Sequence, residues 1–205
     1  MLKFTYKIIN YIIFKISLIY GKLVTFILLR INNVKYDRNF ISNGIPKIFK
    51  NDKSSFLIGK NVKINNTIKN NPIGRSFQCI FVIKKNAQLI IDDNTGMSGT
   101  TIVCSNSIKI GKNVKIGANT CIYDTDFHSL NFKERRNREN DIESTKSKSI
   151  VIGNDVFIGA HSTILKGVII GNNSIIGACS VITKNIPENE VWAGNPAKFI
   201  KKINY

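Results

Sequence analysis

Isoleucine recurs every six residues along the second half of the chain, and mainly polar or small residues fill the places between. The repeat runs from Ile110 to Ile122 and, after an interruption, from Ile152 to Ile182. Glycine follows the isoleucine in six of the nine units. With Asp126 as the exception, the fifth place of each unit is small or β-branched and is filled by Val114, Thr120, Val156, Ser162, Val168, Ser174, Ser180 or Ile186.

A period this short predicts a solenoid of stacked repeats. Six is a multiple of the strand period of two, so each unit fits a short strand followed by a tight turn. We expect every repeated isoleucine to point inward onto one stacked column, and the small fifth residue to turn into a narrow corner. Glycine and asparagine are expected to provide the positive φ angles that a bend every six residues requires.

Residues 1–31 are mostly aliphatic and aromatic, with cations at intervals of four to eight residues. These cations are Lys3, Lys7, Lys15, Lys22 and Arg30. At 100° per residue they fall on one broad side, which predicts an amphipathic helix. No uninterrupted apolar run approaches the roughly 20 residues of a spanning helix, and no cleavage site follows a compact apolar core, so neither a span nor a signal peptide is expected. The helix is expected to lie on an anionic membrane surface, or else to pack its apolar side on the solenoid or between subunits.

The other segments complete one domain with appendages. Residues 1–55 are expected to hold the helix and a linker, residues 56–186 the solenoid, and residues 187–205 a tail. The gap from Ile122 to Ile152 is 30 residues, an integral number of sixes, so the array can resume in register. Residues 124–149 within that gap are polar and charged and cannot form core. They predict a protruding external loop, a feature that usually serves function in a compact domain.

The chain has 30 Lys and Arg against 13 Asp and Glu, a net charge of +17. Such a charge favours anionic partners. Aromatic residues do not alternate with basic ones in any patch outside residues 1–31, so a nucleic-acid partner is not expected. The four cysteines form no C-x-x-C pair and predict neither a disulfide framework nor a zinc site, which fits a reducing compartment.

Two histidines are present, His128 and His161. His128 lies in the stretch Y-D-T-D-F-H-S, where the array gives way to the loop. Proton removal from a hydroxyl needs a base that titrates near neutrality, and histidine is the usual choice. Asp126 and Asp124 are near enough in sequence to orient the ring, and a backbone carbonyl is a third alternative. His161, in the unit I-G-A-H-S-T, is expected to point out of a coil.

Three stretches occur together with the repeats in this chain: D-T-D-F-H-S at 124–129, I-G-A-H-S-T-I-L-K-G-V at 158–168 and A-G-N-P-A-K at 193–198. With them, roughly residues 96–203 resemble the hexapeptide-repeat acetyltransferases of the maltose/galactoside and capsular polysaccharide O-acetyltransferase type. The resemblance implies an all-β fold, a left-handed parallel β-helix with three sixes in each triangular coil. It also implies that His128 is the catalytic base and that His161 has no catalytic role.

The resemblance further implies acetyl-CoA as co-substrate, no metal, and a homotrimer that shares its active sites between subunits. His128 of one chain would face the coils of residues 158–180 of the next. The positions that match the acetyl-CoA site are Ala160, Ala178, Thr183, Lys184, Lys198 and Lys201. The N–H of Ala160 would meet the thioester carbonyl, Ala178 would lie along the pantetheine arm, and the other four would meet the adenosine and phosphate end.

The acceptor side matches the family less well. Galactoside enzymes carry an asparagine about two coils before the histidine, where this chain has Ser98 and Gly99. We therefore expect Ser98 to line the acceptor site and the acceptor to differ from that simple sugar. Arg136, with Arg135 and Arg138, is expected to meet an acidic or phosphate-bearing saccharide, or else to form a solvated face of the loop.

These observations predict an acetyl-CoA-dependent O-acetyltransferase acting directly on a sugar hydroxyl of a capsule, lipopolysaccharide or exopolysaccharide precursor. The expected location is the cytoplasm, peripherally at the inner face of the plasma membrane. One alternative is an amino-sugar N-acetyltransferase, and another is a non-catalytic β-solenoid scaffold that binds membranes through residues 1–31. Carbonic-anhydrase relatives with the same fold need three histidine positions for zinc, which two histidines cannot fill.

Overall fold

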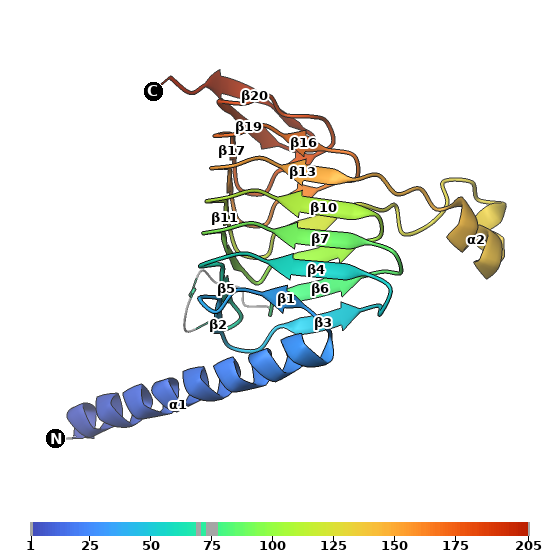
Figure 1. Ribbon diagram of the computed structural model, residues 1–205. Coiled ribbons are helices and arrows are strands. Elements are labelled where there is room, and N and C mark those ends of the chain that lie inside the picture. The colour runs from blue at the N-terminus through green and yellow to red at the C-terminus, as the bar shows by residue number, and fades with distance from the viewer. Residues whose placement is uncertain (1, 69–70, 73–77, 205) are drawn as a thin grey trace.

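The computed structural model describes residues 2–68, 71–72 and 78–204. Its strands stack into a three-sided parallel β-helix, with one long helix across the base and one loop projecting from the side (Figure 1). The predicted solenoid is confirmed. Each turn of the chain adds one strand to each of three sheets, so parallel pairing runs the length of the stack.

The three sheets form the three sides of the coil. The first sheet contains β1 (Lys35–Tyr36), β4 (Ser55–Ile58), β7 (Gln88–Ile91), β10 (Ser107–Ile110), β13 (Ile150–Ile152) and β16 (Ile169–Ile170). The second contains β2 (Ile41–Asn43), β5 (Lys63–Asn65), β8 (Gly96–Ser98), β11 (Lys115–Ile116), β14 (Phe157–Ile158), β17 (Ile175–Ile176), β19 (Glu190–Gly194) and β20 (Ala197–Lys202). The third contains β3 (Lys47–Lys50), β6 (Ile80–Ile83), β9 (Thr101–Cys104), β12 (Cys121–Tyr123), β15 (Thr163–Ile164) and β18 (Val181–Ile182).

The repeated isoleucines form the core, and none of the nine is more than 4% exposed. They stack in three columns, one on each sheet, rather than in the single column expected from the sequence. Ile122, Ile164 and Ile182 make one such column in register. The fifth-place residues are buried at the corners as predicted. Ile110 pairs with Ile152 across the 30-residue gap, so the array does resume in register.

The glycine of each unit serves close packing rather than a positive φ angle. A Cβ atom added at Gly117 would lie 2.4 Å from the backbone nitrogen of Ala160, and one added at Gly159 would lie 2.4 Å from that of Ala178. The coils therefore touch backbone to backbone at this corner. The left-handed conformation falls instead two residues after the glycine, for example at Asn119 and His161, with φ angles of 58° and 61°.

Two segments predicted as linker and tail belong to the β-helix. Strands β1, β2 and β3 pair with β4, β5 and β6, so the first coil begins at Lys35 and not at residue 56. At the other end, β19 pairs in parallel with β17 and then turns back as an antiparallel hairpin with β20. The predicted boundaries of the external loop, residues 124–149, match the gap between β12 and β13.

The predicted N-terminal helix is confirmed as α1 (Leu2–Ile31). It crosses the base of the β-helix and extends beyond it (Figure 1). By length and composition α1 is long and apolar enough to cross a membrane, which the absence of an uninterrupted apolar run in the sequence did not lead us to expect. The loop also contains helical structure that the sequence pattern did not predict: η1 (Glu134–Arg136) and α2 (Arg138–Ser144).

Candidate active site

The external loop leaves the β-helix at the corner between the third and first sheets. A short antiparallel stalk holds its base, in which Asp126 N–H donates to the carbonyl of Lys146 and Lys148 N–H to that of Asp124. At the far end Asn137 caps α2, because its side chain accepts hydrogen bonds from the N–H groups of Glu139 and Asn140 at 2.9 and 3.1 Å. The stalk and the cap give the loop a defined shape outside the repeat.

His128 lies at the tip of this stalk, and α2 supplies its partner. Nδ1 of His128 is 2.6 Å from Oδ2 of Asp141, whose Oδ1 accepts the N–H of Ser129 at 2.7 Å. The hydrogen bond from His128, and after it that from Ser129, lowers the pKa of Asp141. An ionised carboxylate can only accept hydrogen bonds. Nδ1 of His128 therefore carries the hydrogen, so in the neutral imidazole it is Nε2 that has the lone pair.

The imidazole is accessible while its partner is enclosed. The side chain of His128 is 69% exposed, and that of Asp141 is 13% exposed. Arg135 stabilises the same turn by donating from Nη1 to the carbonyl oxygen of Ser129. The geometry thus presents one basic nitrogen outward on a ring that is fixed from behind, which is the arrangement that a general base requires.

The predicted orienting residues contact other groups. Oδ1 of Asp126 is 2.7 Å from Nζ of Lys166. Asp124 is buried and accepts the N–H groups of Ser105 and Asn106 at 2.6 and 2.8 Å. Neither carboxylate holds His128, so Asp126 was the wrong choice and Asp141 is the residue that was missed. The available signal was Asn137, a typical helix N-cap, followed by acidic residues in the first turn.

The coil residues expected to bind acetyl-CoA lie along the corner between the second and third sheets. Ala160 is half-buried and Ala178 is exposed, and they occupy equivalent places in successive coils. Within the described ranges the N–H of Ala160 has no hydrogen-bond partner, while its carbonyl accepts the N–H of Cys179 at 2.9 Å. His161 follows in the left-handed turn position, and its N–H donates to the carbonyl of Ala118. The N–H of Ala160 is therefore not engaged by any of the described residues.

The four remaining residues of the predicted acetyl-CoA site are all exposed. Thr183 and Lys184 follow β18 at the corner between the third and first sheets, and Lys198 and Lys201 lie on β20. Thr183 and Lys184 therefore lie at a different corner from Ala160, whereas Lys198 pairs with Ala193, which packs on Gly177 next to Ala178. Among the described residues, no group of three or more His, Cys, Asp and Glu side chains is arranged to hold a metal ion.

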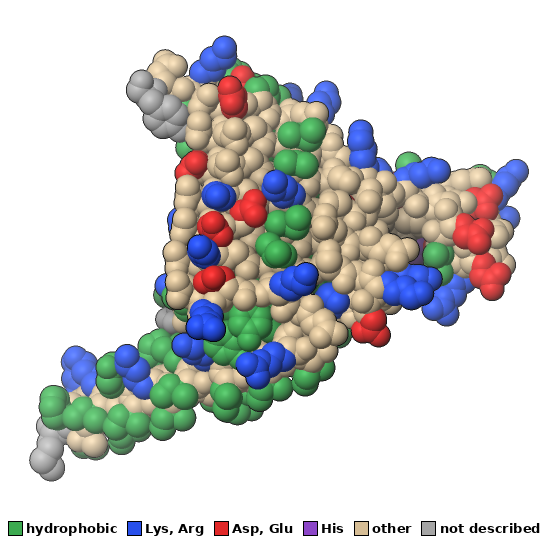
Figure 2. All heavy atoms as spheres, viewed as in Figure 1, with side chains coloured by type: hydrophobic (Ala, Val, Ile, Leu, Met, Phe, Trp, Pro, Cys, Tyr) green, Lys and Arg blue, Asp and Glu red, His purple; other side chains and the backbone are tan. Residues whose placement is uncertain are grey.

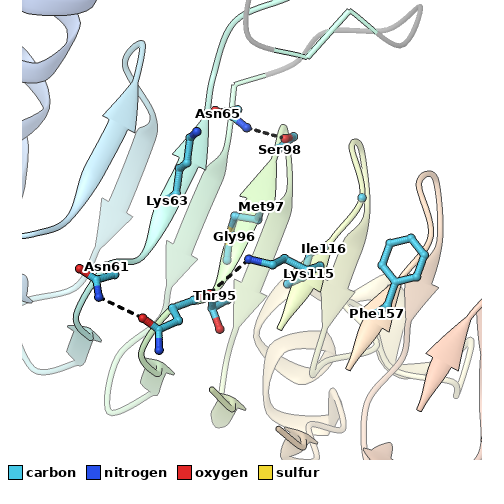
Figure 3. Close-up of a pocket in the computed structure, with 12 residues that line it drawn as sticks. Asn61, Lys63, Asn65, Thr95, Gly96, Met97, Ser98, Lys115, Ile116 and Phe157 are labelled. Carbon is cyan, nitrogen blue, oxygen red and sulfur yellow. Dashed lines mark hydrogen bonds between the residues drawn. The ribbon is translucent and has the colours of Figure 1, made fainter. Parts of the chain in front are cut away.

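Ser98 borders a shallow cavity of about 380 Å³ on the outer face of the second sheet (Figure 3). Its hydroxyl accepts a hydrogen bond from Nδ2 of Asn65 at 3.0 Å. Lys63 and Lys115 lie on either side of Gly96, and Phe157 closes one end (Figure 3). The cavity therefore combines neutral hydrogen-bonding groups with two cations.

Arg136 lies elsewhere, in η1 of the loop. Its guanidinium carbon is 5.2 Å from the centre of the Phe132 ring. No hydrogen bond or ion pair within the described part of the chain links His128 to Ser98, Arg136 or the predicted acetyl-CoA residues. Within one protomer, the imidazole of His128 in the loop and the corner of Ala160 on the coils are thus not joined by such a contact.

Two family models match this chain in the repeat region. The description "Bacterial transferase hexapeptide (six repeats)" applies to residues 149–184, and "Hexapeptide repeat of succinyl-transferase" to residues 96–124. Together with the stacked parallel coils, these matches confirm the predicted fold class, a left-handed parallel β-helix, and the resemblance to hexapeptide-repeat acetyltransferases.

Three curated relatives match parts of the chain. The chain is 31% identical over 121 residues to WbbJ of Escherichia coli K12, whose name assigns it to lipopolysaccharide biosynthesis as an O-acetyl transferase. It is 44% identical over 104 residues to galactoside O-acetyltransferase of the same strain, and 63% identical over 54 residues to Protein CapG of Staphylococcus aureus. The matches cover 57%, 51% and 26% of this chain, and 62%, 48% and 31% of those proteins.

A solved structure shares the fold over most of its length. It is a point mutant of AntD, an N-acyltransferase from Bacillus cereus, in complex with dTDP-4-amino-4,6-dideoxyglucose and coenzyme A. The likeness has a TM-score of 0.69 and 20% sequence identity, and covers 87% of this chain and 88% of AntD.

Proposed function

We propose, from the premise that this chain carries bacterial transferase hexapeptide repeats, that it is an acetyl-CoA-dependent O-acetyltransferase acting on a saccharide hydroxyl. The observation that carries the proposal is the fixed imidazole of His128, with Nδ1 on Asp141 and Nε2 open to solvent. The curated relatives named as O-acetyltransferases support transfer to oxygen. AntD, an N-acyltransferase, shares the fold at 20% identity, so transfer to an amino sugar is the second candidate.

The residues perform a direct transfer. Nε2 of His128 takes the proton of the acceptor hydroxyl while that oxygen forms a bond to the thioester carbonyl carbon. The free N–H of Ala160 stabilises the negative charge that develops on the carbonyl oxygen. The carbon–sulfur bond then breaks, and the imidazolium returns the proton to the departing thiolate of CoA. Asp141 stabilises the imidazolium while it carries the extra proton.

A covalent acetyl-cysteine step has no support from the two buried thiols. Burial raises the pKa of Cys79 and of Cys104 to about 12 in each case. A thiolate, and not a thiol, is the nucleophile in acyl transfer. This agrees with a mechanism in which the acetyl group passes straight from CoA to the acceptor.

The acetyl-CoA site is proposed along the corner of Ala160 and Ala178. Glycine at 117 and 159 lets successive coils approach closely there, and the small alanine side chains leave room for a narrow pantetheine arm. Thr183 and Lys184 after β18, and Lys198 and Lys201 on the terminal hairpin, would meet the adenosine and phosphate end, with the three lysines acting as point charges. Coenzyme A and 3-hydroxybutyryl-CoA are the acyl carriers bound in AntD structures.

The acceptor site is proposed at the cavity beside Ser98. Lys63 and Lys115 give it positive charge, and the ladder of Asn65 and Ser98 offers hydrogen-bond partners for sugar hydroxyls. Such a lining suits a saccharide that carries a phosphate or a carboxylate, as in the precursors of capsule, lipopolysaccharide or exopolysaccharide. Arg136 in the loop would add a further cation. Because acetyl-CoA is made and used inside the cell, we place the reaction in the cytoplasm.

A homotrimer would complete the site. The loop projects away from the coils of its own chain (Figure 1), and its apolar side chains Leu130, Phe132 and Ile142 are exposed. Seated against a neighbouring protomer, the loop would bury these side chains and bring His128 to the corner of Ala160. In a closed three-fold ring each of the three loops has a neighbouring protomer to pack against. Sedimentation at micromolar concentration tests this assembly, and a fully active monomer would contradict it.

The test of function is release of CoA thiol from acetyl-CoA with a panel of neutral and anionic saccharides. His128→Ala should lower kcat by at least about 10²-fold while acetyl-CoA affinity stays nearly unchanged. His161→Ala, the matched control, should cost about tenfold or less. Mass spectrometry of the product separates O-acetylation from N-acetylation. An inactive His161→Ala beside an active His128→Ala would place the base elsewhere, and absence of both turnover and acetyl-CoA binding would favour a scaffold.

A further inference from the structure

The helix α1 is fixed to the β-helix by one narrow stripe of its surface. Its buried residues are Gly21, Thr25 and Leu29. A Cβ atom at Gly21 would lie 3.0 Å from the Cα of Gly44, so the two backbones are in contact. Thr25 donates from its hydroxyl to the carbonyl of Gly44 at 3.1 Å. This seat near the end of α1 sets the direction in which the rest of the helix points.

The apolar side of α1 faces away from the protein. At 100° per residue, Ile9, Ile16, Leu23 and Ile27 lie opposite the seated stripe. Their side chains are 50%, 61%, 60% and 48% exposed. Figure 2 shows hydrophobic side chains along the underside of the helix, continuing past the end of the β-helix. An exposed apolar surface of this length marks a site that binds a membrane or another protein.

Four of the five cations of α1 lie on its other side, and the fifth, Arg30 at the seated end, falls next to Leu23 on the helical wheel. Lys3, Lys7, Lys15 and Lys22 fall within the arc that contains the seated stripe, and Figure 2 shows basic side chains on the side of the helix that faces the β-helix. The helix holds no acidic residue. Its 30 residues give a length of about 45 Å. Lysines on the protein side and isoleucines on the far side would place charges at the lipid headgroups when the isoleucines enter the acyl boundary.

We propose that α1 docks the protein onto an anionic lipid bilayer, lying in the interface with the side of Ile9, Ile16 and Leu23 buried. The β-helix then stands on the water side, with its first coil nearest the membrane. The separation of lysines and isoleucines onto two sides of α1 favours a helix that lies in the interface over one that crosses the bilayer. A crossing helix would carry Lys7 and Lys15 into hydrocarbon at a cost of several kcal/mol. A second copy of α1 is a poorer occupant, since its lysines would add like charge and bring no acidic partner.

The experiment is co-sedimentation of the full-length protein with vesicles of phosphatidylcholine alone and of phosphatidylcholine mixed with phosphatidylglycerol. We expect binding to the mixed vesicles, weaker binding to the neutral ones, and release by alkaline carbonate. Lys7, Lys15 and Lys22→Gln together should weaken binding to the mixed vesicles by about 10²-fold, at roughly fivefold per cation. The matched control is Lys60, Lys109 and Lys202→Gln on the β-helix, which removes the same charge and should have little effect.

A second set tests the apolar side. Ile9, Ile16 and Leu23→Gln should abolish binding to both kinds of vesicle, whereas Leu57, Val151 and Ile169→Gln on the β-helix should not. Circular dichroism verifies that each variant is folded. Resistance to carbonate would show that α1 crosses the bilayer. Vesicle binding that is unchanged in both sets of α1 variants would overturn the proposal. A change of sedimentation without vesicle binding would assign the apolar side to a second copy. Acetyl transfer is not the readout, so this test is independent of the proposed enzymatic function.

Discussion

In the coils, each repeated isoleucine is stacked in register on the equivalent residue of the next coil and is almost fully buried. In the loop of residues 124–149, Leu130 is 80% exposed, and the contacts that shape the loop include a short stalk, a helix cap and the two hydrogen bonds that Asp141 accepts from His128 and Ser129. The coils derive their stability from burial that repeats every six residues. The loop derives its shape from a few specific polar contacts.

This difference separates stability from chemistry. A repeated core tolerates a long insertion, because Ile110 still pairs with Ile152 whatever lies between β12 and β13. The insertion is then free to carry residues such as His128 and Asp141 that would be costly inside the stack. Changes in the coils should therefore alter the free energy of unfolding, and changes in the loop should alter turnover.

The largest effect is expected in the core. Ile164 is fully buried between Ile122 and Ile182. Ile164→Ala should lower the free energy of unfolding by about 2–5 kcal/mol, because it removes buried methyl groups and leaves a cavity. Urea unfolding measures this loss. Ile169→Ala, on the exposed outer face of the coil, serves as the control and should cost less than about 1 kcal/mol; equal losses at both positions would contradict the stacked-core account.

The next effect concerns the loop and its positioning residue. Asp141→Asn should lower kcat about tenfold to 10²-fold with an unchanged KM for acetyl-CoA, because the imidazole loses its fixed orientation and the partner of its charged form. Urea unfolding of the coils should stay the same. In the His128→Ala background the substitution should add little, since the two residues act as one unit.

Asp126→Asn is the matched control for that prediction. Asp126 is close to His128 in sequence, but it contacts Lys166. Its substitution should change kcat by less than about threefold. If Asp126→Asn were the more damaging change, the orientation of His128 seen here would not be the catalytic one.

The contrast also explains which features were predictable from the sequence. The period of isoleucine gives the coils, their register and the loop boundaries, because identical stacked environments select similar residues. The first coil was not predictable from the repeat, because its core includes Phe40 and Ser42 in place of the regular unit. Asp141 escaped because its contact with His128 spans 13 residues and depends on where α2 lies. A contact that occurs only once in the chain leaves no periodic pattern in the sequence.

A smaller effect is expected at the terminal hairpin. Lys198→Ala and Lys201→Ala should each raise the Kd for acetyl-CoA about two- to fivefold, as expected for exposed charges that meet phosphate. The effect should shrink as salt is added. Lys202→Ala, on the same strand and not assigned to the site, should leave the Kd unchanged. Calorimetric titration at two salt concentrations measures all three, and an equal response of Lys202→Ala would reduce the site to a general basic surface.

The smallest effect is expected in the pH dependence of two carboxylates whose pKa values are shifted in opposite directions. Burial raises the pKa of Asp124, at the root of the loop, whereas hydrogen bonds from His128 and Ser129 lower that of Asp141. A lowered pKa contributes stability that is present above the ordinary aspartate value and is lost as pH falls through the lowered value. A raised pKa has the opposite sign, and its contribution is lost as pH rises from the ordinary value to the raised one.

The two turns should therefore respond in sequence as the pH is lowered from neutrality. The amide resonances of Ser105 and Asn106, which donate to Asp124, should shift first, at a pH above the ordinary aspartate pKa. The amide of Ser129, which donates to Asp141, should shift below it. Asp141→Asn should abolish the later step and leave the earlier one intact. An amide titration by nuclear magnetic resonance decides the order, and simultaneous steps would mean that the loop and the coil corner open together rather than as separate units.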